Sequence, residues 1–137
     1  MGVKRAKGAK AKADKLFSQV IRSVGYCEAD GWDDIKCSPQ LQTMHIISRK
    51  YNATRCDTRN AISGCAAHHR YFTDHPMRFS RFVTSIWAGK YRDLMWERSR
   101  DSSIGKAVDW DERVAFLEDI KEGRLTLKQA RDEYEDN

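Results

Sequence analysis

The sequence predicts an α+β fold that is mostly helical. Apolar residues recur at helical spacing near both ends of the chain, over residues 16–24 and 111–134. Between these regions, residues 41–47 have the composition of an extended segment, and residues 48–60 are polar and rich in turn-forming residues. The chain has 137 residues, which is enough for one domain with a modest core and excludes a multidomain enzyme.

The N-terminal part predicts a helix followed by a loop. Leu16, Phe17 and Val20 begin a helical repeat that ends at Gly25, a residue suited to the left-handed end of a helix. Residues 26–40 then contain one glycine, one proline, four acids and two cysteines. This segment has too little apolar content to order itself, so we expect an internal cross-link to hold it.

The central part predicts a strand, a loop, a second strand and a helix, in that order. The first strand covers residues 41–47, the polar loop residues 48–60 and the second strand residues 61–64. Residues 66–74 predict a helix that Pro76 stops. Two strands followed by one helix form a compact unit to which the terminal helices can add.

The C-terminal part predicts further helices. Phe79 to Arg98 carry aromatic and apolar residues at helical spacing, which we interpret as core residues. Residues 111–122 predict an amphipathic helix, and residues 125–134 predict a last short helix with Thr126 as its N-cap.

Charge divides the chain into three parts. Residues 1–15 carry six Lys or Arg against one Asp, while residues 106–137 carry six against ten acids. We therefore expect a basic flexible arm over residues 1–14, a central domain over residues 15–100 and an acidic helical extension over residues 101–137. A basic head and centre suit a polyanionic partner, and the acidic extension should point elsewhere. A merely solubilising arm would have the same composition.

The cysteines predict a metal site. The chain has four Cys and no apolar stretch long enough to cross a bilayer or to form the core of a signal peptide. We expect a cytoplasmic protein with no membrane partner, whose thiols stay reduced and bind metal in preference to forming disulfides. Cys56 lies in the polar loop and is expected to be packed without a ligand role.

Three cysteines and one histidine have the composition of a structural zinc site. Cys65 and His68 are three residues apart at the start of a predicted helix, so that both can face one metal. Cys27 and Cys37 flank the loop that needs a cross-link and complete a Cys3His set with no open position. Asp30 is the competing ligand, because it stands where a tighter Cys-x2-Cys pair would place its second Cys.

The residues from Leu41 to Asn60, followed by Cys65-Ala-Ala-His68-His69, resemble an HNH endonuclease of the phage type. The residues that carry the resemblance are His45, Asn60 and His69. The resemblance covers residues 16–98. It implies a ββα-metal core that holds a structural zinc and is flanked by N- and C-terminal helices.

The resemblance implies a role for each of the three residues. His45 is the general base that takes a proton from water, Asn60 orients that water, and His69 is a ligand of a catalytic divalent metal. An Asn in this place can also hold the imidazole by a hydrogen bond without adding a charge that repels phosphate.

Two positions depart from the family pattern. Met44 stands where the family usually has Asp, His or another metal ligand, and Thr73 stands where it often has a second helix His. Besides water, His75 and Asp57 are the remaining candidates to join His69. This set predicts weak binding of Mg2+, a softer metal such as Mn2+, Ni2+ or Zn2+, or a degenerate site.

Cationic side chains surround the expected site in the sequence and are predicted to bind DNA phosphates. They are Arg49, Lys50, Arg55, Arg59 and Arg70. Arg55 has an alternative structural role, in which it pairs with Asp57 within the loop. No element suited to reading bases is evident, so we expect little sequence specificity.

The resemblance thus implies a metal-dependent HNH DNA endonuclease or nickase that is phage-encoded, is linked to DNA packaging and acts in the cytoplasm of the host. Its expected partners are DNA and the subunits of a phage terminase. The alternative is a catalytically degenerate protein, held by the same zinc, that binds DNA or assists the terminase.

Overall fold

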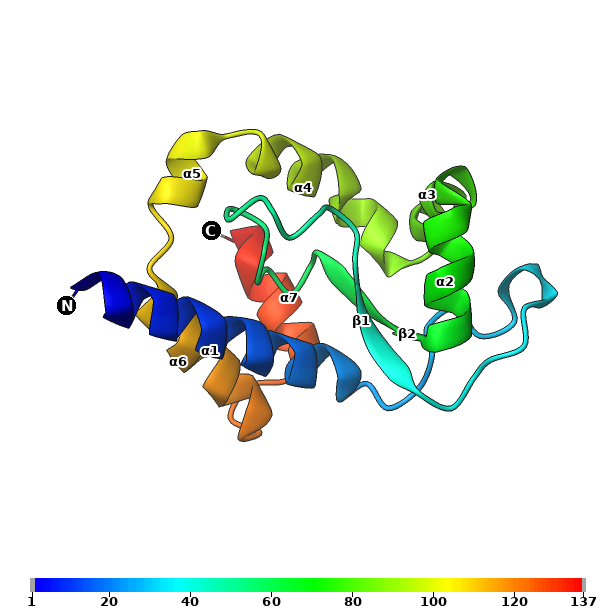
Figure 1. Ribbon diagram of the computed structural model, residues 1–137, viewed down its shortest axis with the longest axis horizontal. Coiled ribbons are helices and arrows are strands. Elements are labelled where there is room, and N and C mark those ends of the chain that lie inside the picture. Colours follow the sequence, from blue (N-terminus) through cyan, green and yellow to red (C-terminus); the bar gives the residue numbers. More distant parts are fainter. Residues whose placement is uncertain (1, 137) are drawn as a thin grey trace.

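The computed structural model describes the backbone of residues 2–136 and the side chains of residues 8–132. It has the predicted α+β fold, in which helices surround one small antiparallel sheet (Figure 1). The elements are α1 (Gly2–Arg22), η1 (Trp32–Asp34), β1 (Leu41–His45), β2 (Ala61–Cys65), α2 (Ala66–Asp74), α3 (Pro76–Ser85), η2 (Trp87–Tyr91), α4 (Arg92–Ser99), α5 (Ser102–Lys106), α6 (Trp110–Lys121) and α7 (Leu127–Asp136). None of the described helices is both long and apolar enough to cross a membrane.

The predicted strand, loop, strand and helix are confirmed. β1 and β2 pair antiparallel, with Met44 opposite Ile62 and His45 opposite Ala61. β1 ends at His45, two residues earlier than predicted, because the chain turns there into the polar loop. Every residue of β2 is buried. The strand is covered because α1 and α2 both pack against the sheet.

The sequence predicted a flexible arm over residues 1–14. In the structure, α1 runs without a break from Gly2 to Arg22. Its Lys- and Ala-rich composition favours a helix once one face has a partner. That face begins at Ala13, which is fully buried, and continues through Phe17 and Ile21. Arm and first helix are therefore one element.

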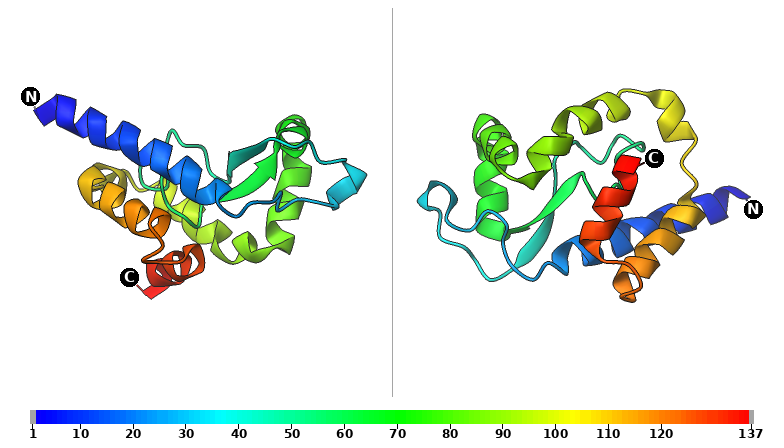
Figure 2. Two further views of the ribbon diagram at one scale, coloured as in Figure 1. Left: turned by 90° about the horizontal axis from the view of Figure 1, so that it is seen from below. Right: turned by 180° about the vertical axis from the view of Figure 1, so that it is seen from behind.

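The C-terminal helices share a core with α1. Leu117, Ile120 and Ala130 lie in one apolar cluster with the buried face of α1. Figure 2 shows α6 alongside α1 from two directions. The expected boundary near residue 100 is thus not a break in packing. The acidic extension is helical as predicted, but it does not point away from the basic helix: Glu118 pairs with Lys12 at 3.1 Å.

A second apolar cluster lies between the sheet and α2 and α3. It includes Met44, Ile62 and two aromatic residues, Phe72 and Phe82, whose rings stack with centroids 5.1 Å apart. The predicted helical repeat over residues 79–98 is confirmed but broken into α3, η2 and α4.

The helix breaks at Ile86, whose backbone is extended, and Gly89 then lets the chain return close to the end of α3. A Cβ atom at this position would lie 2.8 Å from the backbone oxygen of Thr84, so the chain folds back on α3 only with glycine here. Most of the aromatic side chains from Phe79 onward are core residues as predicted, but Trp96 is 50% exposed.

If α6 belongs to the main core, Leu117→Ala lowers the free energy of unfolding by about 2–5 kcal/mol, the usual cost of truncating a buried leucine. The control is Leu94→Ala, because Leu94 is 37% exposed on α4. Urea denaturation followed by circular dichroism measures both. Equal, small losses in the two variants would contradict the shared core.

Candidate functional site

Four side chains predicted to bind one metal meet in the structure. The ligand atoms of Cys27, Cys37, Cys65 and His68 all lie within 4.8 Å of one another. The sulfurs of Cys27, Cys37 and Cys65 lie 3.7, 3.6 and 3.2 Å, respectively, from His68 Nδ1. A tetrahedral site with a metal–sulfur bond near 2.3 Å and a metal–nitrogen bond of about 2.0–2.1 Å has nitrogen–sulfur separations of about 3.6 Å. The group could therefore hold a metal ion.

Three separate segments bring these ligands together. Cys27 follows the turn after α1, and Cys37 follows η1 at the far end of the same loop. Cys65 ends β2 and caps α2, because its sulfur accepts a hydrogen bond from the His68 backbone N–H at 3.3 Å. The loop that lacks apolar content is thus tied to the start of α2, as the sequence predicted.

The surroundings of the four ligands suit a cation. His68 is fully buried, and its Nε2 lies 3.4 Å from the Trp32 carbonyl, an arrangement that directs Nδ1 toward the sulfurs. Burial acts to raise the pKa of Cys65, but hydrogen bonds led by the His68 N–H lower it to about 6. Burial and the neighbouring thiols raise the pKa of Cys37 to about 12. A bound cation removes this mutual repulsion.

The group of candidate ligands includes Cys37 and not Asp30. The Cys37 thiol belongs to the ligand group and donates a hydrogen bond to Asp30 Oδ1 at 3.6 Å. The carboxylate is exposed and lies outside the group of four. Cys56, as expected, is buried elsewhere, where burial strongly raises the pKa of its thiol and its sulfur contacts Asp14 at 3.4 Å.

His45 lies at the end of β1, where its ring packs 5.6 Å from that of Phe17. Burial lowers its pKa, and so does the charge of Arg49, while a hydrogen bond to the backbone of Arg55 acts in the opposite direction. The imidazole is therefore neutral at pH 7, and a neutral imidazole can accept a proton.

Asn60 holds the loop and does not reach the groove. Its side chain is fully buried. Its amide donates to the carbonyls of Ile47 and Thr54 at 3.0 and 3.1 Å, and its oxygen accepts from the Ile47 N–H at 2.9 Å. All of these hydrogen bonds go to backbone groups, so Asn60 positions the loop after His45. The water-orienting role that the resemblance implies stays a prediction.

His69 follows His68 on α2 and faces β1. Its Nδ1 lies 2.7 Å from Gln42 Oε1, so Nδ1 donates and Nε2 is left as the acceptor or metal ligand. Sequence reasoning missed Gln42. Its only signal was its place three residues before His45, which gives no hint of a contact with α2.

The other residues considered as ligands of a catalytic metal make contacts elsewhere in the fold. Met44 is 2% exposed and packs in the core, where its sulfur fills the space that a side chain on Gly64 would need. Asp57 is equally buried and pairs with Arg59 at 2.7 Å. Thr73 donates to the His69 carbonyl, as expected of a helix residue.

His75 is exposed and packs against Tyr71, with ring centroids 4.7 Å apart. Within the described part of the chain, the Cys3His group is the only set of three or more candidate ligands.

Two of the five predicted DNA-binding cations have structural roles. Arg59 is buried against Asp57, and Arg55 donates to both oxygens of Asp14 at 2.8 and 2.7 Å. Arg55 thus pairs with Asp14 on α1 and not with Asp57. Both guanidinium groups are thus used inside the fold, and DNA binding by these two residues stays a prediction.

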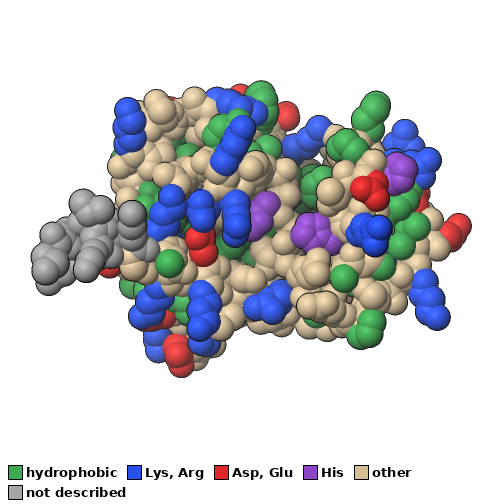
Figure 3. Space-filling model, in the orientation of Figure 1, with side chains coloured by type: hydrophobic (Ala, Val, Ile, Leu, Met, Phe, Trp, Pro, Cys, Tyr) green, Lys and Arg blue, Asp and Glu red, His purple; other side chains and the backbone are tan. Residues whose placement is uncertain are grey.

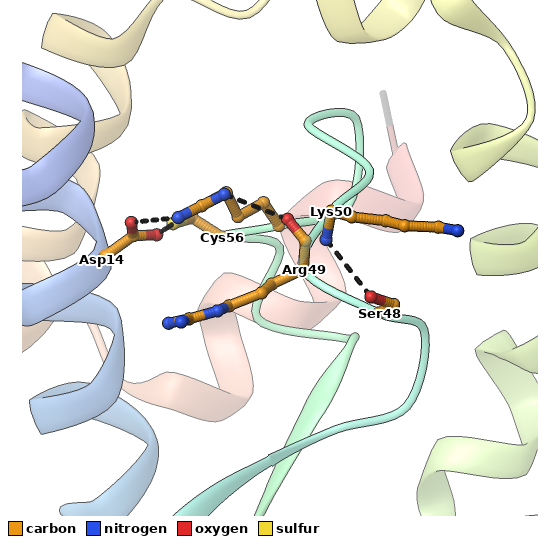
Figure 4. Close-up of polar contacts among 6 residues, drawn as sticks. Asp14, Ser48, Arg49, Lys50 and Cys56 are labelled. Atoms are coloured by element: carbon orange, nitrogen blue, oxygen red, sulfur yellow. Dashed lines mark hydrogen bonds and ion pairs between the residues drawn. The ribbon is translucent and has the colours of Figure 1, made fainter. Parts of the chain in front are cut away.

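The other three cations, Arg49, Lys50 and Arg70, are exposed. Figure 4 shows that Arg49 points toward α1 and that Lys50 points the opposite way. Arg70 lies on α2 and is not among the residues that line the groove described next.

A groove of about 620 Å3 brings the histidines and cations together. His45, His69 and Arg49 line it with Arg22 from α1, a cation that sequence reasoning did not select. His45 and His69 also line a smaller adjoining hollow of about 200 Å3. Figure 3 shows histidine side chains open to solvent near the middle of this face, between lysine and arginine side chains.

Comparison of the chain with protein-family models, with curated proteins and with solved structures finds no match. The geometry described above is therefore the basis for a functional proposal.

The lowered pKa of His45 predicts a dependence of stability on pH. Above pH 6.5 the ring is neutral in both the folded and the unfolded state. As the pH falls below 6.5, the unfolded state binds the proton first, so the free energy of unfolding decreases until the folded state is protonated as well.

The titration of His45 by NMR should accordingly have a midpoint below 6.5, and His45→Gln should lose less stability than wild type between pH 7 and pH 5. A midpoint at or above 6.5 would contradict the buried, neutral imidazole.

Proposed function

We propose that this protein is a metal-dependent DNA endonuclease or nickase of the HNH type. The observation that carries the proposal is the groove in which His45 and His69, from β1 and α2, lie with Arg22 and Arg49. A neutral imidazole, a second imidazole and two cations are the groups that hydrolysis of a phosphodiester needs. The strand–loop–strand–helix order of residues 41–74 supports it.

The chain's own residues have distinct parts in the proposed reaction. Arg22 and Arg49 hold the phosphate in the groove, and Arg49 also keeps the neighbouring His45 neutral. His45 takes a proton from a water, whose oxygen attacks phosphorus while the bond to the 3′ oxygen breaks. A divalent metal bound through His69 would stabilise negative charge on the phosphate and on the leaving oxygen. The products are a 5′-phosphate and a 3′-hydroxyl.

We propose zinc as the metal of the Cys3His group. Three thiolates and one imidazole form a closed tetrahedral set, which is typical of structural zinc. Zinc here would join the loop of residues 27–37 to the first turn of α2, and His69 follows directly in that turn. The structural metal would thus fix the place of the proposed catalytic ligand.

One observation favours a second candidate function. Because Met44 is a core residue, the position before His45 supplies no oxygen or nitrogen ligand to accompany His69. A protein with the same zinc and basic groove but without catalysis would bind DNA, or would assist a phage terminase, as the resemblance also allows. The activity of the purified protein separates the two candidates.

We predict that the protein nicks supercoiled plasmid in at least one of Mg2+, Mn2+, Ni2+ and Zn2+. His45→Ala should lower the rate about 10²–10⁴-fold, the usual contribution of a general base. The control is His75→Ala, which removes an exposed histidine outside the groove. A wild type that is folded and silent in every metal would leave the DNA-binding candidate.

We also predict one tightly bound zinc for each chain. Cys37→Ser should reduce the zinc content measured by elemental analysis and lower the melting temperature, because it removes one of four ligands. Cys56→Ser is the matched control, since it removes a buried thiol outside the ligand group. Full zinc content in Cys37→Ser would mean that Asp30 supplies the fourth ligand.

A further inference from the structure

A second basic surface lies across the loop from the groove. Arg100, near the end of α4, stacks its guanidinium 3.6 Å from the ring centroid of Trp96 and 4.5 Å from that of Tyr51. Lys50 lies 5.0 Å from the same tyrosine ring. Two exposed cations therefore share one tyrosine ring, and a half-exposed tryptophan lies beside them.

The charges of this surface are available to a partner. Among residues 8–132, neither Lys50 nor Arg100 forms an ion pair with a carboxylate. Lys106 and Asp101 also line the shallow hollow of about 370 Å3 between them. The Asp101 carboxylate accepts hydrogen bonds from Ser103 as the N-cap of α5. Burial acts to raise the pKa of the Tyr51 hydroxyl, but hydrogen bonds and charge from Lys50 and Arg100 lower it overall, as expected in a positive field.

The loop between the two basic surfaces is a ridge. Consecutive residues Arg49 and Lys50 point to opposite sides of it, toward α1 and away from α1 (Figure 4). Arg49 lines the histidine groove, while Lys50 lines the hollow beside α4 and α5. Hydrogen bonds from Arg55 fix this ridge to α1, because the Arg55 guanidinium donates both to the Arg49 carbonyl, at 3.2 Å, and to the Asp14 carboxylate.

We propose that residues 48–52 enter a groove of duplex DNA. One strand then lies along His45 and Arg49, and the phosphates of the other strand contact Lys50 and Arg100. This inference rests on the proposed function, and it adds a second surface, formed by Lys50 and Arg100, that holds the other strand of the duplex. Two basic surfaces on either side of a narrow ridge match the two phosphate backbones that flank a DNA groove. A single strand would occupy only one of the surfaces.

The test compares DNA binding at several salt concentrations, with no divalent metal added, by fluorescence anisotropy. The probes are a short duplex oligonucleotide and one of its strands alone. The variant Lys50→Gln/Arg100→Gln should reduce the slope of log affinity against log salt by about two for the duplex, since each phosphate contact contributes about 0.9. The slope for the single strand should stay unchanged.

The matched control is Lys128→Gln/Arg81→Gln, which removes two exposed charges from α7 and α3. A duplex slope equal to that of the control, or an equal decrease for duplex and single strand, would overturn the inference.

Arg49→Gln separates this result from the proposed function. It should reduce the slope for both probes, because Arg49 lines the histidine groove. If Arg49→Gln weakens binding and the Lys50/Arg100 variant does not, only the second surface is refuted. If wild type binds neither probe, the proposed function fails together with it.

Discussion

The ion pair between Asp14 and Arg55 sets the position of the loop on which the candidate site depends. It joins residues 41 positions apart through two hydrogen bonds of 2.8 and 2.7 Å. The pair is partly buried, and a bidentate contact of this kind has a fixed geometry. The Arg55 side chain also donates to the Arg49 carbonyl, and the Arg55 backbone forms a hydrogen bond with the His45 ring. One contact with α1 therefore orients both Arg49 and His45 in the groove.

The Cys3His group is a second constraint, at the other end of the sheet. It fixes the start of α2 through Cys65 and His68, while the loop after β1 is fixed through Asn60. His45 and His69 therefore occupy positions determined by two different parts of the fold. A groove lined by both histidines requires that each part be in place, since neither strand nor helix is long enough to be rigid alone.

The pairing of basic and acidic helices changes the meaning of the charge pattern. The basic N-terminal segment and the acidic C-terminal segment are both parts of one core, through Ala13 and Leu117, and are not separate tails. Some of the positive charge of α1 is matched locally, as in the contact of Lys12 with Glu118. The proposed DNA binding therefore rests on the exposed cations beside the groove, among them Arg22 and Arg49, and not on the arm.

The sequence by itself determined the strand–loop–strand–helix order and the four candidate metal ligands, because hydrophobic periodicity, Gly and Pro positions and Cys spacing are local signals. Only the tertiary structure decided the roles of Asn60, Arg55 and Arg59, and the burial of Met44. A polar side chain looks the same in the sequence whether it faces solvent or pairs within the fold. Its partner, here Asp14 or a loop carbonyl far along the chain, is known only once the elements pack.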